Sequence, residues 1–176
     1  MKTKVISYSY TGNNEALAAD FAKEIGAEHL RITEPKKRTA GMIVKENLFK
    51  RDPKINLSKD EISEDVFAIF FGPFWFGKIA SPLRSYFKQL KNRSFKYGFV
   101  SLCVGPDDPE ADDNLKDELN NMIGKDPEFI ILKKIADLFP PDPQPTQQML
   151  TQYRLNEKDL KMLVSSIKDT LGNTTL

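Results

Sequence analysis

The segment that most constrains the fold is the continuous apolar run at 66–72, which reads VFAIFFG. A strand that is apolar at every position must be covered on both faces, as a central strand of a parallel sheet is. Shorter apolar runs and amphipathic patterns alternate on either side of it. The alternation predicts strands at 4–8, 28–32, 66–72, 96–104 and 129–136, and helices at 15–25, 40–50, 81–90, 111–123 and 156–171.

This alternation predicts an α/β protein in which helices cover both faces of a five-stranded parallel sheet, a three-layer sandwich. The 176 residues fit a single domain, 1–176, with a sizeable core. Two helix starts stand out: Ser81 before Pro82, and Asn156, each expected to be an N-cap. The segment 138–153 contains four prolines and leaves the last strand, so we expect a lid, a contact surface or a disordered connection there.

Composition excludes several classes of function. The net charge is +1, which gives no overall attraction to nucleic acid or to a membrane. No run is long enough to span a membrane and the chain enters a strand at once, so neither a span nor a signal peptide is expected, and the cytoplasm is the default location. Cys103 is the single cysteine and His29 the single histidine, so we expect no disulfide within the chain and no metal site.

Ligands of open α/β sheets bind at the carboxyl ends of the strands, so the loops after the first, third and fourth strands are the ones of interest. The first loop, 9–14, reads SYTGNN and opens a helix. Unpaired N–H groups and the dipole of a helix N-terminus favour an anion, and Gly12 permits close approach of the backbone. The loop has no Lys or Arg. It could hold a phosphate, or it could simply cap the helix.

The second loop, 72–78, reads GPFWFGK and places three aromatic residues between two glycines at a strand end. Exposed aromatic rings are costly unless they cover something flat and apolar, so a planar heterocycle is one explanation. A corner of the core or a dimer surface is the other. A nucleotide P-loop, a dinucleotide fingerprint and a phosphoacceptor domain all lack their required residues here.

These motifs resemble those of flavodoxin-like FMN-binding proteins, the flavodoxins and the flavodoxin-type quinone reductases. The phosphate loop of that family, Ser/Thr-x-Thr-Gly-x-Thr, is similar to Ser9-x-Thr11-Gly12-Asn13-Asn14 here, although Asn14 stands where a hydroxyl is usual. Their Pro-x-Trp-x-Gly stretch is similar to Pro73-x-Trp75-x-Gly77. The resemblance spans nearly the whole chain and implies strand order 2-1-3-4-5 and FMN as the cofactor.

The resemblance also implies which residues would contact each part of the cofactor. Side-chain and backbone groups of the first loop would bind the phosphate, the aromatic loop would lie along the isoalloxazine ring, and the loop after the fourth strand would close the pyrimidine side. No catalytic side chain is implied, because the flavin itself carries out the redox chemistry. The expected cofactor-binding residues are Ser9, Thr11, Gly12, Asn13, Asn14, Pro73, Phe74, Trp75, Phe76, Gly77, Cys103, Val104 and Gly105.

Two functions follow from the resemblance, and both stay open here. One is electron transfer through bound FMN to a redox partner protein. The other is an FMN-dependent NAD(P)H oxidoreductase with a quinone-like acceptor, often a homodimer. Lys78 beside the aromatic loop and the near-neutral charge differ from acidic electron carriers. A flavin-free scaffold with the same fold is a third, lesser alternative.

Overall fold

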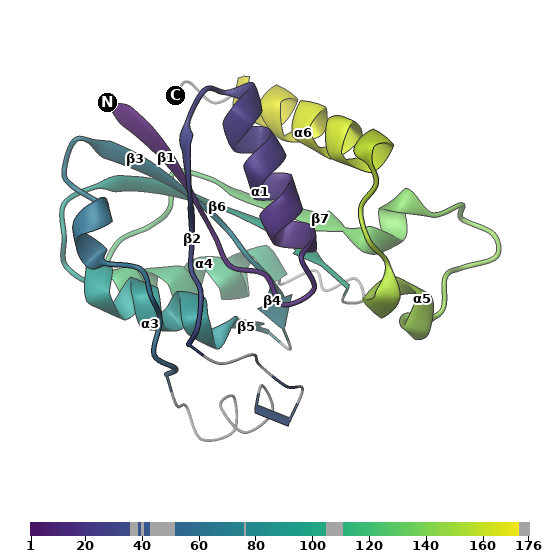
Figure 1. Cartoon of the computed structure of the whole chain (residues 1–176), viewed down its shortest axis with the longest axis horizontal. Helices are drawn as coiled ribbons and strands as arrows, with labels where there is room; N and C mark the ends of the chain where they lie inside the picture. The colour runs from purple at the N-terminus through teal and green to yellow at the C-terminus, as the bar shows by residue number, and fades with distance from the viewer. Residues whose placement is uncertain (36–38, 40, 43–51, 76, 105–110, 173–176) are drawn as a thin grey trace.

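The computed structural model describes residues 1–35, 39, 41–42, 52–75, 77–104 and 111–172. Helices and strands alternate along most of it (Figure 1). In chain order the elements are β1 (Lys2–Ser7), α1 (Asn13–Glu24), β2 (Glu28–Arg31), the 3-10 helix η1 (Lys59–Glu61), β3 (Val66–Phe71), β4 (Phe74–Trp75), β5 (Lys78–Ile79), α3 (Ser81–Leu90), β6 (Lys96–Cys103), α4 (Ala111–Ile123), β7 (Ile130–Lys134), the 3-10 helix η2 (Ile135–Leu138), α5 (Gln147–Gln152) and α6 (Glu157–Gly172).

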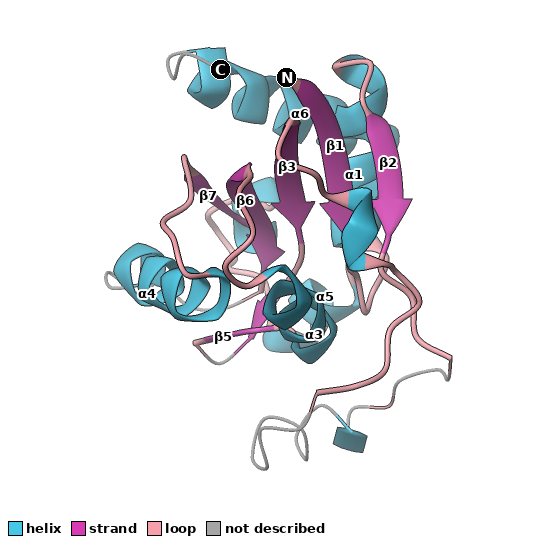
Figure 2. Ribbon diagram, turned by 90° about the vertical axis from the view of Figure 1, so that its left-hand side faces the viewer, coloured by secondary structure: helices cyan, strands magenta, loops and turns pink. Residues whose placement is uncertain are grey.

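Five of the strands form one parallel sheet in the order β2-β1-β3-β6-β7. Counted within this sheet alone, the order is 2-1-3-4-5, as the sequence resemblance implied. Val5 pairs with Ile69 across β1 and β3, and Ile69 pairs with Gly98 across β3 and β6. Helices α1 and α6 cover one face, and α3 and α4 cover the other (Figures 1 and 2). The predicted three-layer α/β architecture is therefore confirmed.

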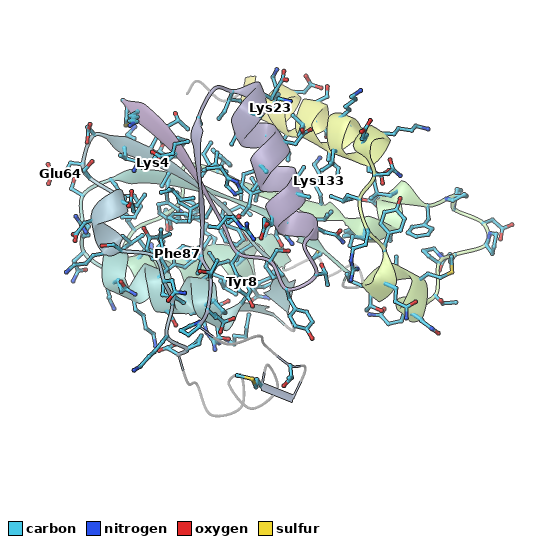
Figure 3. All side chains as sticks on the ribbon, viewed as in Figure 1. Lys4, Tyr8, Lys23, Glu64, Phe87 and Lys133 are labelled. Carbon is cyan, nitrogen blue, oxygen red and sulfur yellow. The ribbon has the colours of Figure 1, made fainter. Side chains whose placement is uncertain are left out.

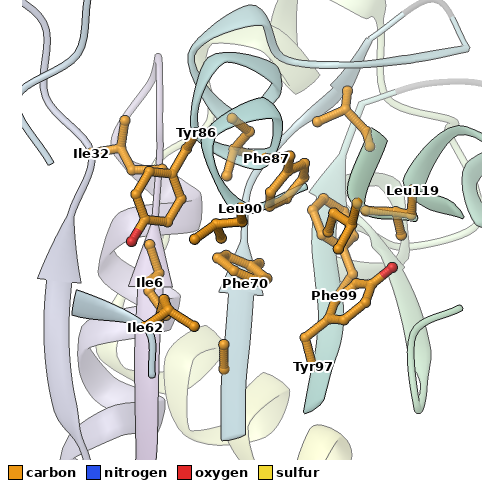
Figure 4. Packing of buried hydrophobic residues seen from close by; sticks show 14 of the residues in the cluster. Ile6, Ile32, Ile62, Phe70, Tyr86, Phe87, Leu90, Tyr97, Phe99 and Leu119 are labelled. Atoms are coloured by element: carbon orange, nitrogen blue, oxygen red, sulfur yellow. The ribbon is translucent and has the colours of Figure 1, made fainter. Parts of the chain in front are cut away.

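The central strand β3 separates two hydrophobic clusters. All six of its residues are buried, as the apolar run predicted. Phe70 points to the α3 side, where its ring meets Phe87 edge-on at 4.8 Å between centroids and Tyr97 at 6.1 Å (Figure 4). Phe71 points to the other side and contacts Phe21 of α1 at 5.4 Å. Aromatic rings therefore fill both layers between the sheet and its helices.

The predicted helix starts differ in their outcome. Asn156 caps α6 as expected, because its Oδ1 accepts hydrogen bonds from the backbone N–H groups of Lys158 (2.9 Å) and Asp159 (3.1 Å). Ser81 is not the N-cap of α3: it is the first helical residue, and Ala80 occupies the cap position without a side-chain cap bond. Pro82 still lies in the first turn, where a missing N–H costs nothing.

At three predicted segments the structure differs from the expectation or adds to it. The strand predicted at 129–136 is shorter, because the chain turns into the 3-10 helix η2 after Lys134. Most of the helix predicted at 40–50 lies outside the described residues. The proline-rich segment holds the short helix α5, which Thr146 caps by accepting from the N–H of Met149 and which buries Leu150. Among the described helices, none is both long and apolar enough to cross a membrane.

Candidate ligand-binding site at the carboxyl edge of the sheet

Three loops meet at one edge because β1, β3 and β6 are parallel neighbours. Lys4 lies within β1, and Tyr8 follows its last residue, Ser7, and marks the end from which the first loop leaves (Figure 3). The backbone continues the sheet slightly into the loops, since the N–H of Tyr8 donates to Phe71 O and that of Gly72 donates to Val100 O. The loops that begin at residues 8, 72 and 104 thus start side by side.

The first loop ends in a helix N-terminus without a side-chain cap. Gly12 occupies the N-cap position of α1 with φ of 95°, a left-handed conformation that favours glycine. Its N–H donates to the hydroxyl oxygen of Ser9 at 3.0 Å, which closes the turn. Within the described residues, no side chain caps the first turn of α1. Its N–H groups and the positive end of the helix dipole therefore provide an anion-binding geometry.

The side chain of Asn14 joins this loop to the middle of the sheet. Its Nδ2 donates to Leu102 O at 2.9 Å, and its Oδ1 accepts from the N–H of Leu102 at the same distance. Asn14 is only 3% exposed, so both bonds lie in the protein interior. We expected this amide to donate to a phosphate. In the structure it instead pairs with both the backbone N–H and the backbone C=O of Leu102.

The side chain of Asn13 is also engaged with the fold. Its Nδ2 donates to Tyr153 O at 3.0 Å, and its Oδ1 accepts from the N–H of Leu155 at 3.2 Å. The Tyr153 hydroxyl in turn donates to Asp159 in the first turn of α6 at 2.8 Å. The chain between α5 and α6 therefore braces the loop after β1. Both asparagines lock the loop in place and leave only backbone groups of these two residues for a ligand.

The aromatic loop forms a two-stranded hairpin that the sequence did not predict. Phe74 pairs with Ile79 and Trp75 with Lys78 in antiparallel register, and Gly77 takes a φ of 69° at the turn. Phe74 is half-buried and packs against the cluster on the α3 side of the sheet. Phe76 lies outside the described residues. The backbone of Trp75 is therefore part of a paired strand.

Two contacts fix the hairpin to its surroundings. The N–H of Ala80 donates to the carbonyl of Pro73 at 3.2 Å, which closes the base of the hairpin. The N–H of Ile79 donates to Oε2 of Glu118 in α4 at 2.9 Å. Burial raises the pKa of Glu118, while this hydrogen bond and the charges of Lys78 and Arg84 act in the opposite direction. A single carboxylate thus holds β5 against α4.

The third loop contributes less to the described geometry. Cys103 is partly exposed at the end of β6, and its thiol donates to Lys133 O at 3.5 Å. Val104 packs at the margin of the cluster on the α1 side of the sheet. Gly105 lies outside the described residues. Of the expected residues, the structure therefore brings those from 9–14, 73–75, 77 and 103–104 to the same edge of the sheet.

Sequence reasoning missed the residues that hold these loops, namely Leu102, Glu118, Tyr153 and Leu155. Their contacts are mostly long-range backbone contacts, for which a sequence carries no local signal. The length and proline content of 138–153 was the one hint, because a long ordered connection must make contacts somewhere. In the described part of the chain, no group of three His, Cys, Asp or Glu side chains could hold a metal ion.

Comparison with known proteins gives similarity in structure alone. No family model matches the sequence, and no curated protein is similar to it. A flavoprotein from Lactobacillus acidophilus NCFM, solved in complex with FMN, superposes with a TM-score of 0.59 at 17% identity over 74% of this chain and 92% of that one. A candidate flavoprotein from Bacteroides eggerthii DSM 20697 gives 0.59 at 16% identity over 95% and 98%. With the observed strand order, these similarities show a flavodoxin-like fold.

Proposed function

We propose that this protein binds FMN non-covalently at the carboxyl edge of the sheet and transfers electrons through it. One observation carries the proposal. An uncapped helix N-terminus, preceded by Gly12 in the left-handed conformation, opens onto the same sheet edge as the hairpin that bears Phe74 and Trp75. A helix N-terminus that can hold a phosphate, next to a hairpin that carries aromatic residues, suits a ligand with a phosphate and a planar ring. The Lactobacillus acidophilus flavoprotein with this fold binds FMN.

The phosphate would be held by neutral donors. The hydroxyls of Ser9 and Thr11 and the backbone N–H groups of Asn13 and Asn14 supply them, and Gly12 allows the backbone to approach closely. Ser9 accepts from the Gly12 N–H through its oxygen, which leaves its hydroxyl proton to donate outward. The two asparagine amides act indirectly, because they fix the loop to β6 and to the segment before α6. Preorganised donors bind a phosphate with little loss of entropy.

The ring would lie between the second and third loops. Pro73, Phe74, Trp75, Phe76 and Gly77 would form one wall. Cys103, Val104 and Gly105 would form the other. Bound FMN supplies the hydride and single-electron chemistry. The protein's part is to position the ring, to limit access of water and to select the partner.

The first test is the absorption spectrum of the purified protein, with any released flavin identified. The flavin-free protein is then titrated with FMN and with riboflavin, which lacks the phosphate. FMN should bind at least about tenfold more tightly, because the helix N-terminus contacts only the phosphate. Thr11→Val should weaken FMN binding and leave riboflavin unchanged, whereas Thr151→Val on α5 should change neither. Equal binding of the two flavins would refute the phosphate seat.

A second candidate is an FMN-dependent NAD(P)H oxidoreductase that reduces a quinone-like acceptor, as a monomer or homodimer in the cytoplasm. Lys78 favours it: this residue is exposed, stands opposite Trp75 on the hairpin and adds positive charge where an acidic carrier would have none. Anaerobic mixing with NADH and with NADPH separates the two functions. Rapid loss of flavin absorbance supports the enzyme. Reduction only by a protein donor or dithionite supports the carrier.

A further inference from the structure

A cavity of about 580 Å³ lies behind the hairpin, between β5, α3 and α4. Figure 2 shows these three elements side by side, and β5 and α4 are in direct contact. Gly77 and Lys78 line the cavity from the hairpin, Arg84 and Lys88 from α3, and Glu118 from α4. A volume of this size accommodates a small organic molecule. Apart from Gly77, none of the lining residues is an expected cofactor contact.

Arg84 is the unusual member of this lining. The residue is 7% exposed, and its Nε and Nη2 atoms are buried without a hydrogen-bond partner in the described structure. These two atoms form one edge of the guanidinium plane, the edge that binds a carboxylate or a phosphate through two parallel hydrogen bonds. Removing a guanidinium from water without a partner is costly. An incoming anion would supply the partner that the folded chain does not.

Asp52, Asp117 and Glu118 also line the cavity, but none of these carboxylates pairs directly with Arg84 in the described structure. None of the ion pairs among the described residues includes it. Lys88 pairs with Asp52, so those two charges cancel. Oε2 of Glu118 accepts from the N–H of Ile79, so this carboxylate interacts with Arg84 only through its charge, which acts to lower the pKa of Glu118. The exposed Lys78 adds a second cation to the cavity wall.

We propose that this cavity is a second binding site, which takes a small organic anion through its carboxylate or phosphate group. The side edge of Arg84 binds the anionic group in a bidentate manner, and Lys78 adds a second positive charge. Of the α4 side chains that line the cavity, Asn114 and Asn121 offer hydrogen bonds to the rest of the ligand, whereas Asp117 and Glu118 are acidic and exclude a second anionic group from their side. The inference does not depend on FMN binding, because Arg84, Asn114 and Asn121 lie outside the proposed flavin site and Lys78 only borders it.

The test is an NMR titration of the full-length protein in a buffer of low ionic strength. The probes are succinate, inorganic phosphate and, at matched ionic strength, sodium chloride. Succinate or phosphate should shift the Nε–H signal of Arg84 and the N–H signal of Ile79 in a saturable manner, and chloride should not. The probe that binds more tightly shows whether the site prefers a carboxylate or a phosphate group. The absence of a saturable shift, or the same shift with chloride, would overturn the proposal.

Matched variants locate the binding. Arg84→Lys keeps the positive charge but removes the pair of N–H donors on one edge of the guanidinium, so it should weaken binding by about tenfold or more. Arg93→Lys, the same change on an arginine after α3 that donates to Lys59 O, should have no effect. Lys78→Gln is at an exposed position that tolerates change, and it should weaken binding by about threefold. Unchanged affinity in both cavity variants would refute the site.

The two proposals fail separately. Arg84→Lys should leave FMN affinity unchanged, because the proposed phosphate seat lies at the start of α1. A protein that binds no flavin but shows the saturable Arg84 shift would retain the anion site and lose the flavin function. A shift of the Arg84 signal that appears with FMN and not with succinate or phosphate would contradict the second site, because the cavity would then belong to the cofactor.

Discussion

Asn14 and Leu102 exchange two hydrogen bonds of 2.9 Å, which join the first turn of α1 to β6 across 88 residues of sequence. The backbone of Leu102 is on the last sheet position but one of β6, and its side chain is buried. The pair therefore sets the distance between the loop after β1 and the loop after β6. Any ligand between those loops depends on it.

We expect Asn14→Ala to lower the free energy of unfolding by about 2–4 kcal/mol, because it leaves a buried N–H and a buried C=O unpaired. Asn14→Asp should be similarly unstable at neutral pH, since a carboxylate cannot donate to Leu102 O. The loss of unfolding free energy in Asn14→Asp should become smaller at acidic pH, because a protonated carboxyl group can donate to Leu102 O. Urea unfolding at several pH values checks this. Wild-type stability in Asn14→Ala would contradict the role of the pair.

Asn13→Ala should act mainly on the loop and less on the global fold. It removes the bonds to Tyr153 O and the Leu155 N–H, which are only partly buried and can be replaced by water. The expected loss of stability is about 1 kcal/mol. Amide hydrogen exchange should increase at the start of α1 and in 153–155. Exchange that rises in one of the two segments alone would show that they are not coupled.

Gly98 is covered by an aromatic ring. A Cβ at this position would lie 2.2 Å from Cζ of Phe129, so Gly98→Ala forces the ring to move. We expect a cost of about 1–3 kcal/mol in thermal or urea unfolding. Gly172→Ala meets open space and should be near neutral. Phe129→Leu combined with Gly98→Ala should cost less than the sum of the single changes, and strict additivity would count against the contact.

Burial lowers the pKa of His29 below its ordinary value of 6.5. The unfolded chain therefore takes up a proton at a higher pH than the folded protein does. The contribution of neutral, buried His29 to stability is fully present above pH 6.5 and is lost as the pH falls through the pKa of His29 in the folded protein. Urea unfolding across this range should show the decline, and His29→Gln should flatten it. Identical slopes in both proteins would exclude His29 as the source.

If FMN binds as proposed, Lys78 should tune its potential. A cation near the ring favours the reduced, negatively charged flavin, so Lys78→Glu should lower the two-electron potential by about 10–30 mV, given that Lys78 is exposed and screened. The measurement is an equilibrium titration against a dye of known potential. Lys161→Glu on α6 makes the same charge change at a distance and should have little effect. An unchanged or raised potential would place Lys78 away from the ring.

The sheet and its flanking helices could be predicted because their signals are local. The run at 66–72 is apolar at every position, and β3 is buried at every position. The Ser81-Pro82 pair marks a helix start wherever the cap falls, which explains why the start was predicted correctly and the capping residue was not. Strands of two residues have no periodicity, so the hairpin that holds Trp75 could not be inferred.

The contacts that define the candidate sites were beyond the sequence for a different reason. The sequence predicted that Asn14 donates a hydrogen bond to a phosphate, and an amide can indeed donate such a bond. What it donates to is decided by Leu102, which the fold brings next to it from a distant strand. Arg84 shows the same limit, since a charge in an amphipathic helix gives no sign that it will face a cavity.

The brace between Asn13 and the chain before α6 has a consequence for how the protein is made. Its partners Tyr153 and Leu155 follow it by 140 and 142 residues, so a ribosome releases the loop long before it releases the segment that fixes it. A nascent chain would hold the sheet strands and still lack a rigid loop. The loop can therefore reach its final shape only late in biosynthesis, after translation has passed residue 155.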